Sequence, residues 1–163
     1  LAAGHWLIRV TRARFPNESD IDYIENLVTT VGLNKYLDAT LKTGLASPAW
    51  YVGLTDGTPS AAAGDTMSSH GGWTEVEAYD EANRVTWTAG TISAGSVDNS
   101  GSTATFTIST NSTTVGGAFL VDDNTKGGTS GTLLAVGAFT AGDKSLDDND
   151  TLDVTATFTQ AAA

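Results

Sequence analysis

The feature that most restricts the fold of this chain is a period-two alternation of apolar residues with threonine. Residues 103–108 and 151–159 place an apolar side chain at every second position, with mostly threonine between them. Because successive side chains of a strand point to opposite faces of a sheet, this pattern predicts half-buried β-strands. Similar patterning predicts three further strands, at residues 6–10, 50–54 and 84–88.

Two other runs are apolar on both faces, at residues 117–121 and 133–136. Continuous apolar runs are typical of central strands that are covered on both sides. Residues 122–128, which lie between them, are rich in Asp, Asn and Gly and predict a turn. Short strands separated by Gly-rich turns indicate a mainly β fold. We expect an antiparallel β-sandwich, immunoglobulin-like or jelly-roll-like, and a small barrel is the open alternative.

One segment near the amino end has helical spacing instead. Its apolar residues recur every three or four positions, at Leu33, Tyr36, Leu37 and Leu41. This spacing predicts one short amphipathic helix at about residues 30–43, packed against the β body. Thr29 or Thr30 is expected to cap its start, and Gly44 to end it in a left-handed conformation.

Charge is distributed unevenly along the sequence. The chain has 8 basic and 19 acidic residues, and a formal charge of −11. Residues 1–45 sum to zero, so residues 46–163 carry the whole excess. We expect an N-terminal arm or strand plus helix at 1–45 and a β-sandwich body at 46–163, within one compact domain overall. The basic residues of the first segment either belong to a solvated strand or contact an acidic partner. Those that we assign to a partner interface are Arg9, Arg12, Arg14, Lys35 and Lys42.

Composition excludes several classes of protein. The sequence has no cysteine, so it cannot form disulfides, thiolate zinc sites or iron–sulfur clusters. The acidic excess argues against nucleic-acid binding, because a phosphate footprint needs clustered Lys and Arg. No run of apolar residues is long enough to span a membrane. We therefore expect no nucleic-acid partner, no membrane association and no secretion signal.

No motif in the sequence points to catalysis. Ser69, His70 and Asp65 are the residue types of a hydrolytic triad, but no Gly-x-Ser-x-Gly elbow exposes the serine. Glu75 and Glu77 share one face of an extended segment, as a glycosidase carboxylate pair would require. Isolated glutamates on strands are usually solvated, however. We expect a non-enzymatic protein with no catalytic residue and no cofactor.

An acidic turn near the carboxyl end has residue types that could bind a metal ion. Asp147, Asp148, Asn149 and Asp150 gather four oxygen-bearing side chains, and Ca²⁺ prefers such ligands. Their spacing lacks the alternation and the central glycine of an EF-hand loop. We interpret residues 147–150 as a hairpin turn in which Asp and Asn tolerate unusual dihedral angles, and we expect no metal.

Aromatic residues suggest a possible sugar-binding surface. Trp50 and Trp87 lie on predicted strands beside apolar residues, so we place them in the core. Trp73 and Tyr79 are flanked by acidic residues and are the better candidates for exposure and for stacking on glycan rings. We place His70 in the loop that packs near Trp73.

Several segments resemble, in the same order, a family of small tailed-bacteriophage virion proteins, head decoration (cement) or tail-associated. The resemblance covers nearly the whole chain from about Trp6, through residues 26–34, 49–54, 65–75, 79–84, 115–120, 129–133 and 149–152. No catalytic motif belongs to the family pattern. The resemblance therefore implies a structural role in the virion.

From the residues and the resemblance together, the main hypothesis is a capsid decoration protein on the outer surface of the phage head. Its partners would be the major capsid protein and further copies of itself, most simply as a homotrimer at quasi-threefold positions. The amino-terminal segment would act as an arm that adds a strand to the capsid. Removal of residues 1–15 is then expected to abolish loading and to leave the body folded.

The alternative hypothesis is a tail-fibre or receptor-binding module that recognises host surface glycans through Trp73 and Tyr79. Copy number separates the two hypotheses. Hundreds of copies per particle indicate decoration, whereas a dozen or fewer indicate a tail location.

Overall fold

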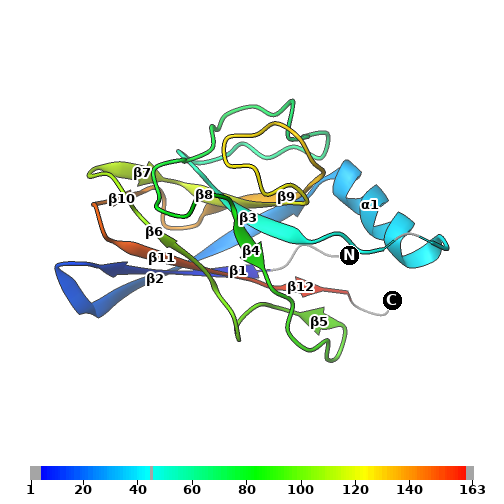
Figure 1. Cartoon of the computed structure of the whole chain (residues 1–163), viewed down its shortest axis with the longest axis horizontal. Helices are drawn as coiled ribbons and strands as arrows, with labels where there is room; N and C mark the ends of the chain where they lie inside the picture. The colour runs from blue at the N-terminus through cyan, green and yellow to red at the C-terminus, as the bar shows by residue number, and fades with distance from the viewer. Residues whose placement is uncertain (1–4, 45, 161–163) are drawn as a thin grey trace.

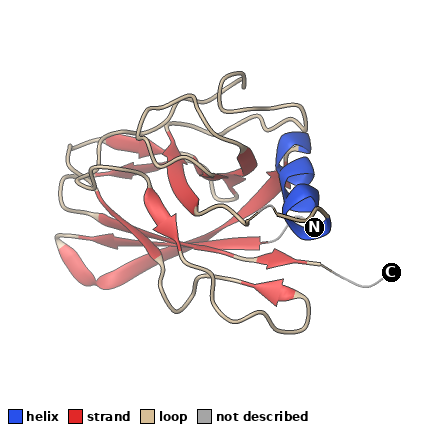
Figure 2. Cartoon of the chain, turned by 45° about the vertical axis from the view of Figure 1, so that its right-hand side comes forward, coloured by secondary structure: helices blue, strands red, loops and turns tan. Residues whose placement is uncertain are grey.

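A computed structural model describes residues 5–44 and 46–160 of the chain. Within these ranges it is mainly β, with one helix, α1 (Thr30–Leu41). The strands run in the order β1 (His5–Arg12), β2 (Phe15–Val28), β3 (Trp50–Thr55), β4 (Val85–Trp87), β5 (Ser96–Val97), β6 (Ala104–Thr107), β7 (Thr113–Val115), β8 (Gly117–Val121), β9 (Leu133–Phe139), β10 (Lys144–Leu146), β11 (Thr151–Ala156) and β12 (Phe158–Thr159). Figures 1 and 2 show their arrangement.

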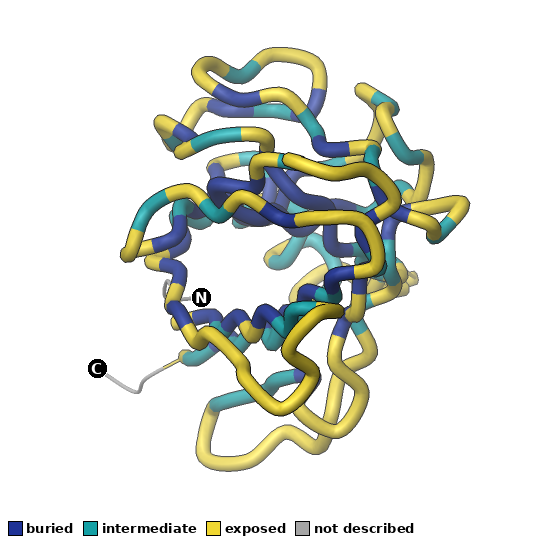
Figure 3. Tube along the Cα trace, turned by 90° about the vertical axis from the view of Figure 1, so that its left-hand side faces the viewer, coloured by how far each residue is buried: buried dark blue, intermediate teal, exposed yellow. Residues whose placement is uncertain are grey.

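Eight strands form a single antiparallel sheet in the order β4-β3-β8-β9-β2-β1-β11-β6. The two edge strands, β4 and β6, contact one another, so the sheet curls almost into a barrel. Seen along the long axis, the chain encircles a central region (Figure 3). The two facing sheets of the predicted sandwich are not seen. A sandwich and a curled sheet both alternate apolar and polar residues along each strand, so the sequence pattern does not separate them.

The inner face of the curled sheet holds the main core. The predicted alternation is confirmed, because the inward residues of the strands are fully or almost fully buried: Trp6, Ile8, Val10, Ile24, Ala104, Phe106, Leu152, Val154 and Ala156. Phe158 lies between two tryptophans, with its ring centroid 5.9 Å from that of Trp6 and 5.8 Å from that of Trp87, both edge-on. These contacts close the core at the end of the sheet where β12 lies.

β8 and β9 are buried on both faces, as their continuous apolar sequences predict. Their inner face belongs to the main core. Their outer face is covered by the long segment 56–84, which contributes Met67 and Trp73 to a second cluster. Phe119 of β8 points into this cluster, and its ring lies against the backbone of Gly53, where any Cβ atom would clash. The segment therefore acts as a lid on the central strands.

The amino-terminal segment is part of this sheet. β1 is hydrogen-bonded to β2 on one side and to β11 on the other, and Trp6 is completely buried. Residues 1–4 lie outside the described residues, but the loss of residues 5–15 would remove the core side chains of β1. The expectation that residues 1–15 can be deleted while the body stays folded is therefore wrong. Strand addition to a partner through β1 is also ruled out, since both of its edges are already paired.

The sequence did not predict β2. Its first half, Phe15–Ile21, is exposed on both faces, so it lacks the alternation that marks the other strands. It pairs with β1 alone there and joins β9 only from Ile24 onward. The first half of β2 and the end of β1 therefore form a hairpin that projects from the barrel (Figure 1).

α1 begins where the sequence predicts. The side chain of Thr29 accepts a hydrogen bond of 3.0 Å from the backbone N–H of Gly32. The helix ends at Leu41 with Lys42 as its C-cap, so Gly44 has the predicted left-handed conformation (φ 81°) but does not end the helix. The predicted burial of its apolar stripe is wrong, since Leu37 and Leu41 are exposed and Gly32 is the one buried helix residue. A side chain at Gly32 would hold the helix away from β9. The helix therefore packs on β9 through glycine, and its large apolar residues remain exposed.

Asp22 is a buried carboxylate on the inward side of β2. It accepts hydrogen bonds from the Thr140 hydroxyl at 2.7 Å and from the backbone N–H of Tyr23 at 2.7 Å, and its Oδ2 lies 3.1 Å from the Lys144 ammonium. Burial by itself raises the pKa of Asp22, but these hydrogen bonds outweigh it and lower the pKa overall. The group joins β2 to the loop between β9 and β10.

We predict that Gly32→Ala destabilises the protein, because its Cβ would lie 2.6 Å from the backbone oxygen of Leu134. Overpacking of this kind costs about 1–3 kcal/mol, more than the gain of about 1 kcal/mol that alanine brings to a helix. Gly64→Ala, which has open space around it, is the matched control. Denaturant unfolding checks both variants. A Gly32→Ala protein as stable as the control would contradict the docking of α1 through this residue.

We also predict a loss of stability in acid that depends on Asp22. Because its pKa is lower in the folded chain than the ordinary value of 3.8, the carboxylate stabilises the fold above that value. The contribution is lost as the pH falls toward the folded pKa. Between about pH 5 and pH 2, the free energy of unfolding should therefore fall less steeply in Asp22→Asn than in the wild type. Asp148→Asn, at an exposed site, is the control, and equal slopes for wild type and Asp22→Asn would contradict the prediction.

Candidate functional site

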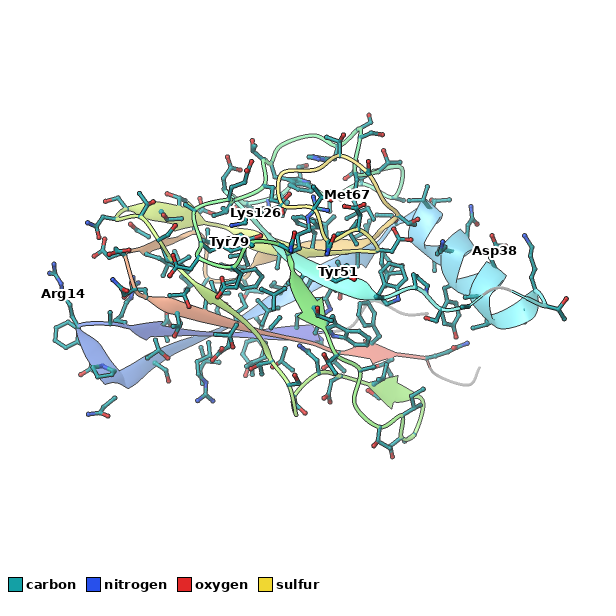
Figure 4. The ribbon with its side chains drawn as sticks, viewed as in Figure 1. Arg14, Asp38, Tyr51, Met67, Tyr79 and Lys126 are labelled. Carbon is teal, nitrogen blue, oxygen red and sulfur yellow. The ribbon has the colours of Figure 1, made fainter. Side chains whose placement is uncertain are left out.

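The three arginines proposed for a partner interface lie in different surroundings. Arg9 is exposed on the outer face of β1, opposite Ile21 of β2 and Asp153 of β11. Arg12 has a structural role, because its guanidinium donates a hydrogen bond of 3.0 Å to Asp150. Arg14 is exposed at the turn of the β1–β2 hairpin, at one end of the molecule (Figure 4). They therefore do not form one basic surface.

Asp150 organises the acidic turn that was considered as a metal site. It accepts hydrogen bonds from Arg12 and from the backbone N–H groups of Ala13 at 2.7 Å and Asp147 at 2.9 Å. Burial raises the pKa of Asp150, but the hydrogen bonds more than offset this and lower the pKa. Asn149 has a φ of 67°. Residues 147–150 thus form a turn with an unusual dihedral angle, as predicted, but the turn is not a hairpin, because β10 pairs with β7 and β11 pairs with β1 and β6. Among the residues that the structure describes, no group of three or more His, Asp or Glu is arranged to hold a metal ion.

The two lysines proposed for the interface both lie on or beside α1 and have acidic neighbours in the same chain. Lys35 lies 3.5 Å from Asp122, in the loop after β8. Lys42 pairs with Asp38, one helical turn earlier. Both lysine side chains still face solvent over much of their surface. Each lysine therefore already has a carboxylate partner within the chain.

Trp73 is buried, so the expectation of an exposed stacking platform is wrong. Only 8% of the residue is exposed. The ring of His70 stacks on it with centroids 3.6 Å apart and planes 9° apart, and the Phe119 ring lies 5.0 Å away. The predicted packing of His70 near Trp73 is confirmed. Burial lowers the pKa of His70, and the nearby charge of Asp65 only partly opposes this. These rings form a packed stack inside the lid.

Tyr79 is likewise covered by its neighbours. The ammonium of Lys126 lies 3.9 Å from the centre of its ring, and Phe106 meets it edge-on at 5.0 Å (Figure 4). Lys126 also donates 2.8 Å to the carbonyl oxygen of Tyr79. Burial, assisted by the negative charge of Glu75, raises the pKa of the Tyr79 hydroxyl. The second proposed glycan contact therefore presents no free aromatic face.

Arg84 and Glu75 form a buried ion pair that the sequence did not reveal. The guanidinium Nε and Nη2 donate to the two carboxylate oxygens of Glu75 at 2.9 and 2.7 Å. Further donations reach the carbonyl oxygens of Asp123 at 2.9 Å and Gly128 at 2.6 Å. This paired, planar geometry is the strongest form of such a contact. The bonds from Arg84 to Asp123 and Gly128 tie the lid to the loop between β8 and β9. The pairing with Arg84 also occupies the carboxylate that a Glu75–Glu77 catalytic pair would need.

A sequence signal for this pair does exist. Residues 46–163 contain only three basic residues, Arg84, Lys126 and Lys144. Each of them contacts buried or carboxylate-bearing groups: Arg84 binds Glu75, Lys126 covers Tyr79, and Lys144 pairs with Asp20 and Asp22. A rare cation in an acidic segment is thus a candidate for a structural ion pair.

An apolar cleft of about 190 Å³ lies between α1 and the adjacent end of the sheet. Tyr36 and Ala39 line it from the helix, and Trp50, Trp87 and Phe158 line it from β3, β4 and β12. Both tryptophans were predicted to be in the core. They do pack against the main core, but they are only half-buried and also form the wall of this cleft. The indole N–H of Trp87 donates a hydrogen bond of 3.1 Å to the carbonyl oxygen of Ala156. The cleft is suited to an apolar side chain.

Apart from Ile92 in the loop before β5, the large exposed apolar residues of the described chain lie on two elements. Phe15, Ile21 and Tyr23 lie on β2, whereas Leu37 and Leu41 lie on α1. Clustered exposure of this kind marks interaction surfaces more often than solvent faces. No helix in the described part of the chain is long and apolar enough to cross a membrane. The candidate site is therefore made of exposed apolar residues on β2 and α1 and of the apolar cleft beside α1.

The chain was compared with known protein families. A family model described as podophage GP4 fiber I protein gp80 matches residues 27–161, more than four-fifths of the sequence. The match begins near the end of β2, so the projecting hairpin precedes it. No curated protein matches the chain. The length of the match confirms the phage virion resemblance: the chain belongs to the podophage GP4 fiber I protein gp80 family of bacteriophage structural proteins.

Proposed function

We propose that this chain is a structural subunit of a phage tail fibre, which works by binding other subunits and performs no catalysis. The observation that carries the proposal is the match of residues 27–161 to a family described by a fibre protein. The surface supports it, because the conspicuous features are exposed apolar residues on β2 and α1 and an apolar cleft between α1 and the sheet.

Capsid decoration has weaker support than a fibre location. That hypothesis needed an amino-terminal arm able to add a strand to the capsid, and β1 is held between β2 and β11. Glycan stacking is not part of the proposal, because Trp73 and Tyr79 are buried. The proposed role in the fibre is therefore assembly with other subunits. It does not include receptor binding through Trp73 and Tyr79.

The charge of the chain fits assembly through a few local contacts. With a formal charge of −11, copies of the chain repel one another and nucleic acid over most of their surface. Attraction is then confined to surfaces where apolar residues or cations are exposed. The hairpin and the α1 end are such surfaces.

We predict that purified virions carry on the order of a dozen copies of this chain, as expected for a symmetric tail appendage. Quantitative mass spectrometry of virions gives the copy number. The major capsid protein, which is present in hundreds of copies, is the internal reference. Immunogold labelling of the same particles is expected to place the chain at the tail.

Hundreds of copies per virion, with gold over the head, would instead establish decoration and refute the fibre proposal. The exposed loop at residues 88–95 is a suitable epitope for the antibody, because it is remote in sequence from both the hairpin and α1.

A further inference from the structure

Three turns meet at one end of the curled sheet: those between β1 and β2, between β6 and β7, and between β10 and β11. The strand register places them together, because Thr151 at the start of β11 pairs with both Thr11 of β1 and Thr107 of β6. Between the turns lies a surface depression of about 470 Å³. Ligand pockets commonly measure about 300–1,000 Å³, and the mouth of a β-barrel is a frequent place for them.

Hydrogen bonds between the turns hold the walls of this depression in place. The hairpin turn is joined to the β10–β11 turn through Asp150, as described above. The β6–β7 turn is joined to it twice. The backbone N–H of Asp148 donates 3.0 Å to Oδ1 of Asn111, and the backbone N–H of Ser112 donates 3.2 Å to Oδ1 of Asp147. The polar side chains of the walls are therefore fixed before any ligand arrives, which lowers the entropic cost of binding.

Each of these fixed side chains keeps polar atoms that bond to nothing else in the described chain. Asn111 is held through Oδ1 and keeps its amide NH₂. Asp147 is held through Oδ1 and keeps Oδ2, whereas Asp148 is held through Oδ2 and keeps Oδ1. Arg12 uses only Nη1, and Arg14 has no hydrogen-bond or ion-pair partner among the described residues. The depression thus offers both donors and acceptors to a ligand.

One aromatic ring completes the wall. Phe15 lines the depression from the start of β2 and is 59% exposed. Pro16 follows it and restricts its backbone to an extended conformation. Arg14, beside it, projects from the hairpin turn at the end of the molecule (Figure 4). An exposed ring among polar groups suits a ligand that has one apolar face and many hydroxyl groups, which is the chemistry of a sugar ring.

The charges of the depression argue against a simple ion as the ligand. Two guanidinium groups and three carboxylates line it, from Arg12, Arg14, Asp147, Asp148 and Asp150. The carboxylates repel an anion and the guanidinium groups repel a cation. No group of His, Asp or Glu within the described ranges is arranged to hold a metal ion. A hydroxyl group, in contrast, donates one hydrogen bond and accepts others, so a neutral ligand rich in hydroxyls matches both kinds of wall.

We propose that this depression binds a neutral saccharide, with Phe15 against the apolar face of a sugar ring. Arg14, Asn111 and Asp147 then form hydrogen bonds to its hydroxyl groups. This binding role is additional to assembly, and it uses none of the buried residues in the lid. It is tested with the purified chain alone, so its outcome is separate from that of the copy-number experiment.

Titration with simple sugars, followed by amide NMR spectra, tests the proposal. The probes are glucose, galactose, mannose, rhamnose, N-acetylglucosamine, maltose and lactose, each added up to about 100 mM. At least one is expected to bind with a Kd on the order of 1 mM. Its effects should be confined to the resonances of residues 12–15, 111–112 and 147–150. Sodium sulfate, calcium chloride and free lysine are the charged probes, and we expect them to bind more weakly than that sugar.

Two variants and their matched controls identify the contacts. Phe15→Ala removes the ring, and Ile92→Ala removes another exposed apolar side chain. Asn111→Asp keeps the oxygen that bonds to Asp148 and loses the free NH₂, and Asn124→Asp makes the same change in an exposed loop outside the depression. Phe15→Ala and Asn111→Asp are each expected to raise the Kd about threefold to tenfold, and the controls to leave it unchanged. The amide spectra of the free variants show whether each is folded.

Three results would overturn the proposal. In the first, no sugar shifts the resonances of the three turns. In the second, sulfate, calcium or lysine binds there more tightly than any sugar, which would make the depression an ion or amino-acid site. In the third, a sugar binds but Phe15→Ala and Asn111→Asp bind it as tightly as the wild type does.

Discussion

The structure depends on the burial of β8 and β9 on both faces. Two strands without a polar face must be covered twice, and the chain does this in two ways. The sheet curls around their inner face, and the segment 56–84 covers their outer face. Arg84, held by Glu75, fastens that cover to the loop between β8 and β9 through its hydrogen bonds to the carbonyl oxygens of Asp123 and Gly128. Removing either cover would leave Phe119 or Leu120 in water.

This arrangement explains how an acidic chain uses its few cations. Arg84, Lys126 and Lys144 all bind groups within the body of the protein. The remaining exposed cations lie on the hairpin and around α1. Because most of the surface is repulsive between copies, the ends of the molecule are left as the surfaces that can attract a partner. The fold thus separates residues that stabilise it from residues that are free to bind.

Local patterns in the sequence predicted the elements, and long-range contacts decided what they do. Alternation in residues 103–108 and 151–159 predicted β6 and β11, and the Thr29 cap marked the start of α1. β2 was missed because its first half is exposed on both faces. Trp73 was expected to be exposed because its neighbours in sequence are acidic, but its neighbours in space are His70 and Phe119. No local pattern reports such contacts, or the curling of one sheet in place of two.

A cryo-electron microscopy map of the intact virion, at a resolution that traces the fibre backbone, tests the account most directly. We expect this fold to lie in the tail fibre, with its exposed apolar residues on β2 and α1 covered by other subunits. A map that places the fold on the head shell, or that leaves these apolar residues of β2 and α1 facing solvent in every copy, would contradict the account.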